Sequence, residues 1–212
     1  MDYNGRSGIH SGSRIPQDFF LQYACPFSNA GGDLRRCIWT GDGQIFCRTA
    51  SLQYDVRHFF RKWLADVRAA QHENGWVPEV VPSLTAYKPG GGAWSDAVTI
   101  IPWQLYQTYG DISFLSDMYE AMEKWIRYIP TVSTTADLWT GCWTYGDWLA
   151  LDWPEDYHPE TIELSKRGYS NDDLICSAFY ANSVNIVIRA EIILGGESRT
   201  VEKGRYLFGT AE

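Results

Sequence analysis

The chain has 212 residues, of which 45% are hydrophobic and 15% aromatic, so it can bury one sizeable core and is globular rather than disordered. The 26 Asp and Glu residues outnumber the 18 Lys and Arg residues, which gives a formal net charge of −8. No cluster of Lys and Arg lies along any predicted helix, so we expect neither nucleic acid nor an anionic membrane as a partner.

The first predicted helix runs from about Leu52 to Ala70, where apolar residues recur at three- and four-residue steps with charged residues between them. This spacing predicts about six helical turns, ended by Asn74-Gly75. A second helix is predicted from about Ser95 to Tyr109, bent at Pro102 and closed by Gly110-Asp111.

A third predicted helix carries apolar residues from Leu115 to Ile129, and Pro130 is expected to stop it. A fourth runs from about Asn171 to Leu194, with two aspartates in its first turn and Gly195-Gly196 just past its end. Long helices joined by aromatic, Gly-rich loops predict an all-α chain, and no separate second domain is visible.

No targeting or metal-binding pattern is recognisable in the sequence. No apolar run approaches the roughly 18–20 residues of a transmembrane helix, and residues 1–17 lack the apolar stretch of a signal peptide, so we expect a cytoplasmic location. The histidines lack HExxH spacing, and no cluster demands a cofactor, so we expect neither a metal nor an organic cofactor. The cysteines form no CxxC pair, and we interpret them as buried or incidental thiols. They are Cys25, Cys37, Cys47, Cys142 and Cys176.

Tryptophan is unusually frequent, with ten residues, many of them next to an acidic residue or a Gly-rich turn. Flat aromatic faces can cover the C–H face of a sugar while carboxylates bind its hydroxyls, so this composition favours a carbohydrate site. Core filling explains the composition alone equally well.

Three clusters place a Trp within three residues of an Asp: Trp39-Thr-Gly-Asp42, Trp94-Ser-Asp96 and Tyr145-Gly-Asp-Trp148. If the helices point the same way, the clusters converge on one rim and form a pocket with aromatic walls and acidic hydroxyl-binding groups. Each cluster alone is better explained as an Asp N-cap beside a Trp that seals a helix end, and Asp96 in particular could do no more than cap. Three together favour the pocket.

Five blocks follow one another in order between about Cys25 and Leu194: Ile38–Ser51, Phe59–Asp66, Asn74–Pro82, Trp94–Trp103 and Tyr145–Asp152. Together they resemble the catalytic domain of glycoside hydrolase family 78, the bacterial and fungal α-L-rhamnosidases. The resemblance implies an (α/α)6 barrel, which is a ring of six helical hairpins, and cleavage of terminal α-L-rhamnose with inversion of configuration.

A barrel of twelve helices needs on the order of 300 residues or more, so this chain corresponds to roughly its first half. We therefore expect a partial (α/α)6 barrel of the six-hairpin glycosidase type over residues 25–212. Residues 1–24 are expected to form a partly irregular N-terminal approach segment. The expected protein is a truncated or rearranged family member.

Inverting hydrolysis needs one carboxylic acid to protonate the leaving oxygen and a second carboxylate to activate water. The resemblance places the acid, a Glu, four residues before Trp39, where this chain has Arg35. Asp33 is the only carboxylate between Phe27 and Arg36, and is the candidate acid despite its shorter side chain and shifted spacing. The family's general base comes from a later hairpin.

The resemblance also assigns substrate contacts. The matching residues are Trp39, Asp42, Trp94, Asp147 and Trp148, with Asp96 as a further contact and Glu79 as a lower-ranked candidate in a loop. The tryptophans would pack on the apolar face of the rhamnose ring and its methyl group. Asp42 would accept hydrogen bonds from ring hydroxyls.

The leading interpretation is an inverting α-L-rhamnosidase acting on L-rhamnose-containing glycosides, impaired by the unmatched acid and the absent base region. A second is a carbohydrate-binding or inert helical remnant that does not cleave sugar. Apolar helix faces left without their hairpins would favour self-association. A third is another (α/α)6 enzyme that acts on a different sugar.

Overall fold

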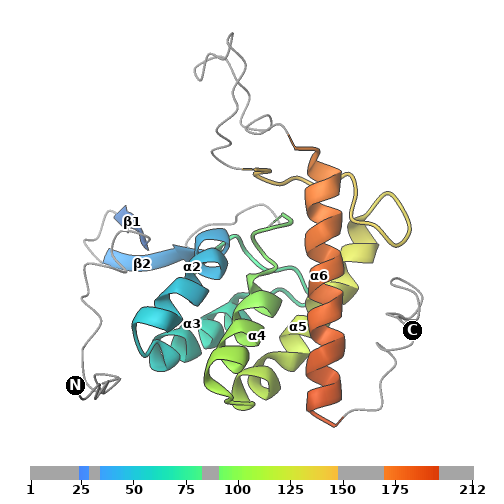
Figure 1. Cartoon of the computed structure of the whole chain (residues 1–212). Helices are drawn as coiled ribbons and strands as arrows, with labels where there is room; N and C mark the ends of the chain where they lie inside the picture. Colours follow the sequence, from blue (N-terminus) through green and yellow to red (C-terminus); the bar gives the residue numbers. More distant parts are fainter. Residues whose placement is uncertain (1–23, 29–33, 83–90, 148–169, 196–212) are drawn as a thin grey trace, which may run out of the picture.

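The computed structural model describes residues 24–28, 34–82, 91–147 and 170–195. The strands in these ranges are β1 (Ala24–Ser28), β2 (Leu34–Trp39) and β3 (Val80–Val81), and the helices are α2 (Thr40–Gln53), α3 (Arg57–Ala70), α4 (Ala97–Tyr109), α5 (Ser113–Val132) and α6 (Asp172–Ile193). In Figure 1, β1 and β2 lie at one side of the molecule beside α2, and the long helix α6 forms the opposite side. The predicted helical class is confirmed, and the small sheet is an addition to it.

The sheet fixes where α2 begins. β2 lies between β1 and β3 and pairs antiparallel with both, with Trp39 opposite Val80. Directly after β2, the backbone N–H and the hydroxyl of Thr40 both donate to the carbonyl oxygen of Glu79, at 2.8 and 2.9 Å. The end of β2 and the first turn of α2 are therefore held by the segment that leads into β3. Of the predicted approach segment 1–24, all but Ala24 lies outside the described residues.

The first predicted helix is wrong in extent. Leu52 belongs to α2 and is 78% exposed. Helix α2 ends at Gln53, and a separate helix, α3, begins at Arg57. The Asp55 carboxylate accepts a hydrogen bond from the backbone N–H of Arg57, a local turn that starts α3 afresh. α3 therefore has 14 residues, fewer than the predicted six turns require.

The other three predicted helices match the structure closely. α4 ends at Tyr109 and is capped by Gly110, which adopts a left-handed conformation with φ 68°. α5 continues two residues past Pro130 to Val132, since a proline removes one helical hydrogen bond and the helix then ends within a turn. α6 begins after Asn171, whose side-chain oxygen accepts from the backbone N–H of Leu174 at 3.0 Å.

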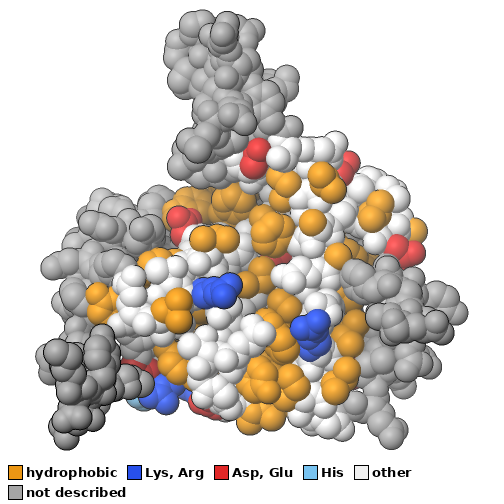
Figure 2. All heavy atoms as spheres, in the orientation of Figure 1, with side chains coloured by type: hydrophobic (Ala, Val, Ile, Leu, Met, Phe, Trp, Pro, Cys, Tyr) orange, Lys and Arg blue, Asp and Glu red, His pale blue; other side chains and the backbone are white. Residues whose placement is uncertain are grey.

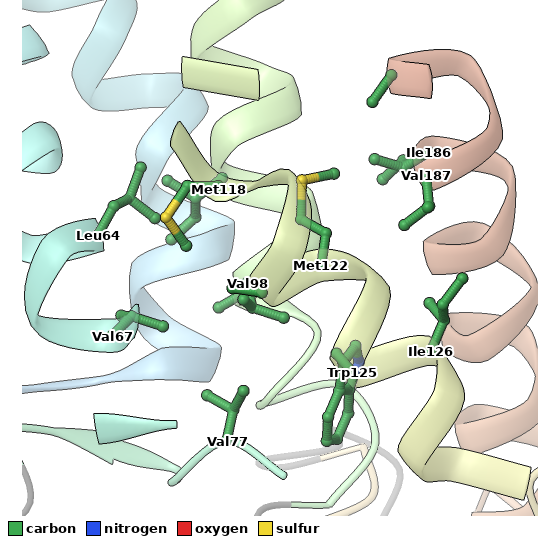
Figure 3. Close-up of a cluster of buried hydrophobic side chains, with 14 of the residues drawn as sticks. Leu64, Val67, Val77, Val98, Met118, Met122, Trp125, Ile126, Ile186 and Val187 are labelled. Carbon is green, nitrogen blue, oxygen red and sulfur yellow. The ribbon is translucent and has the colours of Figure 1, made fainter. Parts of the chain in front are cut away.

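The core lies between α2, α3, α4, α5 and α6. Figure 3 shows α5 side chains such as Met122 and Trp125 between Leu64 and Val67 of α3 on one side and α6 on the other. Trp125 is fully buried and meets Trp139, also buried, edge to face at 5.3 Å. This core carries the segments that precede α4 and follow α5.

One buried carboxylate connects three of these helices. Asp96 lies at the start of α4 and is 0% exposed. Its Oδ1 accepts from the indole N–H of Trp125 on α5 at 3.0 Å and from the hydroxyl of Ser183 on α6 at 2.7 Å, while Oδ2 accepts from the backbone N–H of Ala93 at 2.9 Å. Burial raises the pKa of Asp96, and the hydrogen bonds that it accepts oppose part of this rise.

Large apolar side chains are exposed on the helices at both sides of the molecule. Ile45 and Leu52 lie seven residues apart on α2 and are 73% and 78% exposed, and Leu174 and Ile192 of α6 are also exposed. Figure 2 shows hydrophobic side chains at several places across the visible face. Self-association through such faces stays a prediction. No helix in the described ranges combines the length and apolarity needed to cross a bilayer.

We expect Asp96→Ala to lower the free energy of unfolding by about 3–5 kcal/mol, because the buried N–H groups of Trp125 and Ala93 would lose their acceptor. Urea unfolding followed by circular dichroism measures this change. Asp117→Ala is the control, since its exposed carboxylate pairs with Arg61 and its loss should cost less than about 1 kcal/mol. Equal losses in the two variants would contradict a central role for Asp96.

Candidate functional site

Three tryptophans surround Tyr145 and form what we call the Tyr145 cluster, which consists of Trp39, Trp94, Trp143 and Tyr145. The ring centroid of Tyr145 lies 5.7 Å from that of Trp39, 4.7 Å from that of Trp94 and 4.5 Å from that of Trp143. All four side chains are half-buried. The cluster therefore keeps part of its aromatic surface open to solvent.

The cluster is assembled from segments that lie far apart in the sequence. Trp39 is the last residue of β2, Trp94 lies in the turn before α4, and Trp143 and Tyr145 lie in the segment after α5. Two glycines allow these segments to touch. A Cβ on Gly41 would lie 2.6 Å from the indole Nε1 of Trp94, and a Cβ on Gly91 would lie 2.0 Å from the carbonyl oxygen of Trp143.

Buried polar side chains hold the segment 91–94 in place from two sides. On one side, the side-chain amide of Gln44 on α2 donates to the carbonyl oxygen of Ala93. On the other, the hydroxyl of Thr144 donates to the carbonyl oxygen of Gly92 at 2.8 Å. Ala93 adopts a φ of 69°, unusual for a residue with a Cβ, so its neighbours hold it in this conformation. Trp94 is therefore fixed by the backbone on which it stands.

Asp42 is an exposed carboxylate close in the sequence to Trp39 of this cluster. It lies in the first turn of α2, three residues after Trp39 and next to Gly41, which touches Trp94. Although Asp42 is exposed, the surrounding protein removes part of its hydration and raises its pKa above the ordinary value of 3.8, while a hydrogen bond within its own residue opposes the rise. Aromatic faces beside an ionised acceptor suit a polyhydroxylated ligand.

Two of the candidate residues lie behind the cluster. Asp96 is fully buried, and both of its carboxylate oxygens accept hydrogen bonds from the core. Its side chain makes no capping hydrogen bond to α4 either. The expected sugar contact and the simple cap are thus replaced by a connection between helices. Glu79 is 5% exposed, and its carbonyl oxygen holds the start of α2.

The remaining candidates are Asp147, two residues after Tyr145, and two residues that lie outside the described ranges. Asp147 is half-buried, and its Oδ2 accepts from the backbone N–H and the hydroxyl of Ser170, at 3.2 and 2.9 Å. Asp33 and Trp148 lie outside the described residues. In the part of the chain that the structure describes, no group of three or more His, Cys, Asp or Glu side chains is placed to hold a metal ion.

Sequence reasoning missed the central member of the cluster. Tyr145 belongs to the motif Tyr145-Gly-Asp-Trp148, but the sequence predicts a role only for Asp147 and Trp148 in it. Neither Trp143 nor Gln44 is among the predicted site residues. The alternation of Trp143 and Tyr145 in a segment without helical spacing was the available signal, because alternate residues of an extended segment share one face.

Comparison with known proteins identifies the family. Curated α-L-rhamnosidases from Formosa agariphila and Alteromonas sp. (strain LOR) are 32% and 34% identical to this chain over 160 residues, which is 76% of it. The chain spans only 16% and 17% of the length of these two relatives.

Solved structures show the same likeness. The α-L-rhamnosidase of Streptomyces avermitilis, complexed with L-rhamnose, is 30% identical with a TM-score of 0.65, and the match covers 80% of this chain and 15% of that one. The α-L-rhamnosidase from Dictyoglumus thermophilum is 29% identical with a TM-score of 0.68, and the match covers 82% of this chain and 18% of that one.

These matches confirm the predicted family and its six-hairpin helical fold, of which the described helices form a part. The model of the bacterial α-L-rhamnosidase six-hairpin glycosidase domain matches residues 32–206. The chain therefore belongs to the family of bacterial α-L-rhamnosidase six-hairpin glycosidase domains.

Proposed function

We propose that this chain binds terminal α-L-rhamnosides at the Tyr145 cluster, as the sugar-binding part of an inverting glycoside hydrolase. The observation that carries this proposal is the convergence of Trp39, Trp94 and Trp143 on Tyr145. Asp42, which is exposed, lies in the first turn of α2, three residues after Trp39. The aromatic rings would cover the apolar face and the methyl group of rhamnose. Asp42 would accept hydrogen bonds from its hydroxyls.

The residue at the position of the general acid bears on whether the chain can cleave a bound rhamnoside as well as bind it. Inverting hydrolysis requires two carboxyl groups about 6.5–9.5 Å apart, one as acid and one as base. Arg35 stands in β2 where the family resemblance expects the acid, and a guanidinium keeps its proton at neutral pH and cannot serve as that acid. We therefore propose that hydrolysis by this chain is weak. Sugar binding without cleavage is the second candidate function.

Hydrolysis of 4-nitrophenyl α-L-rhamnoside by the purified chain distinguishes these two functions, with L-rhamnose binding measured in parallel by calorimetry. Binding with little release of nitrophenol supports the proposal. Release that is lost in Asp33→Asn would make Asp33 the acid and favour the enzyme. Absence of both binding and release would contradict both functions.

Removing the Trp94 indole should weaken rhamnose binding roughly 10-fold, because a face that covers the sugar is lost. Calorimetric titration of Trp94→Ala with L-rhamnose measures the change. Trp103→Ala is the matched control, since Trp103 is also half-buried but lies nine residues further along the chain, on α4, beside Tyr106. A similar loss in both variants would place the sugar elsewhere.

Rhamnose binding should also depend on the charge of Asp42. Because its pKa is raised, affinity should be full above that pKa and should fall as the pH drops through it, at a pH above the ordinary value of 3.8. Asp42→Asn should bind roughly 10-fold more weakly near neutral pH and lose this acid-side dependence. Titrations of both proteins from neutral to acidic pH test this. An unchanged pH profile in Asp42→Asn would remove Asp42 from the site.

A further inference from the structure

Two cysteines that are 34 positions apart in the sequence meet, and one of them directly precedes Trp143 of the Tyr145 cluster. The sulfur atoms of Cys142 and Cys176 are 2.9 Å apart and share a hydrogen bond. Cys142 lies in the segment after α5, and Cys176 lies near the start of α6. A Cβ on Gly92 would lie 2.6 Å from the Cys176 sulfur, so this glycine leaves room for the pair. The sequence interpretation of incidental thiols did not include such a pair.

The backbone just before Cys142 is anchored to the start of α6. The backbone N–H of Gly141 donates to the carboxylate of Asp173 at 2.8 Å. The backbone N–H of Trp139 donates to the hydroxyl of Ser177 at 3.1 Å, and Trp139 is itself buried against Trp125. The two sulfurs are thus kept together by contacts that do not involve them.

The two thiols differ in exposure and in ionisation. Cys142 is half-buried, and its pKa is lowered because Cys176 donates a hydrogen bond to its thiolate, although burial and the nearby Asp173 oppose this. Cys176 is fully buried, and its pKa is raised by the same hydrogen bond and by burial. Cys142 is therefore the sulfur that a reagent from solution can meet as a thiolate.

We propose that Cys142 and Cys176 are a redox pair that closes to a disulfide when the chain meets a small disulfide oxidant such as glutathione disulfide. The Cys142 thiolate attacks one sulfur of glutathione disulfide, which breaks that bond and releases one glutathione thiolate. Cys176 then loses its proton and attacks the Cys142 sulfur, which releases the second glutathione. Two protein thiols are oxidised, and one glutathione disulfide is reduced to two glutathione molecules.

Closing this bond would fasten the segment 139–147, which carries Trp143 and Tyr145, to α6. The cross-link removes freedom from the unfolded chain, so the oxidised form should melt roughly 5–10 °C above the reduced form. In a reducing compartment the pair would stay open as two thiols, and in an oxidising one it would close.

The test uses the whole chain, equilibrated with glutathione disulfide, then alkylated with iodoacetamide in denaturant and mapped as peptides by mass spectrometry. The expected result is a peptide pair joined through Cys142 and Cys176. Cys47 should stay reduced during the oxidation, because it is fully buried and burial raises the pKa of its thiol to about 12. It should then be alkylated once the denaturant exposes it. Peptide mapping is needed because Cys25 and Cys37 lie opposite each other across β1 and β2.

A second measurement compares melting of the oxidised and reduced chains. The difference should vanish in Cys142→Ser and persist in Cys47→Ala, which leaves the pair intact. Free thiols at both positions after oxidation, or links formed only with other cysteines or with glutathione, would overturn the proposal. This test involves no sugar, so its outcome is independent of whether the Tyr145 cluster binds rhamnose.

Discussion

The arrangement of α4, α5 and α6 depends on the buried carboxylate of Asp96. A carboxylate buried away from solvent is tolerated only where hydrogen-bond donors surround it. Here the donors come from α5, from α6 and from the turn before α4. Thr99 lies one turn further along α4 and meets the same Ser183 hydroxyl at 2.8 Å. The packing of three helices and the position of the turn that carries Trp94 are thus set by one polar network.

That network lies directly behind the site. Ala93 donates to Asp96 through its N–H and accepts from Gln44 through its carbonyl, so this residue joins the helical core to α2. Trp94 follows immediately and faces Gly41 and Tyr145. A rigid aromatic surface on a loop needs such support, since a loop backbone alone does not fix its side chains.

The sequence predicted those features that rest on local spacing. The apolar stripe of α5 and the acidic first turn of α6 gave helices close to those observed. The stripe of α3 gave the right C-terminal end but began several residues too early. α2 was not predicted as a helix, because its buried face contains Thr40, Gln44 and Ser51 and two glycines, so no apolar stripe marks it. In the Tyr145 cluster, Trp39 and Trp94 are residues that the sequence predicts as substrate contacts, while Tyr145 is not, because contacts between distant segments leave no local pattern. The burial of Asp96 was hidden for the same reason.

The assembly of the Tyr145 cluster from three distant segments also bears on how the chain folds. α4 and α5 are joined by a short turn and can pack while the chain is still largely open, since closing a short loop is fast. Trp39 and Tyr145 are more than one hundred positions apart, and they meet only after the ends of a long loop have come together. We therefore expect helical structure to form ahead of the aromatic surface, so that the chain acquires its shape before it acquires its site.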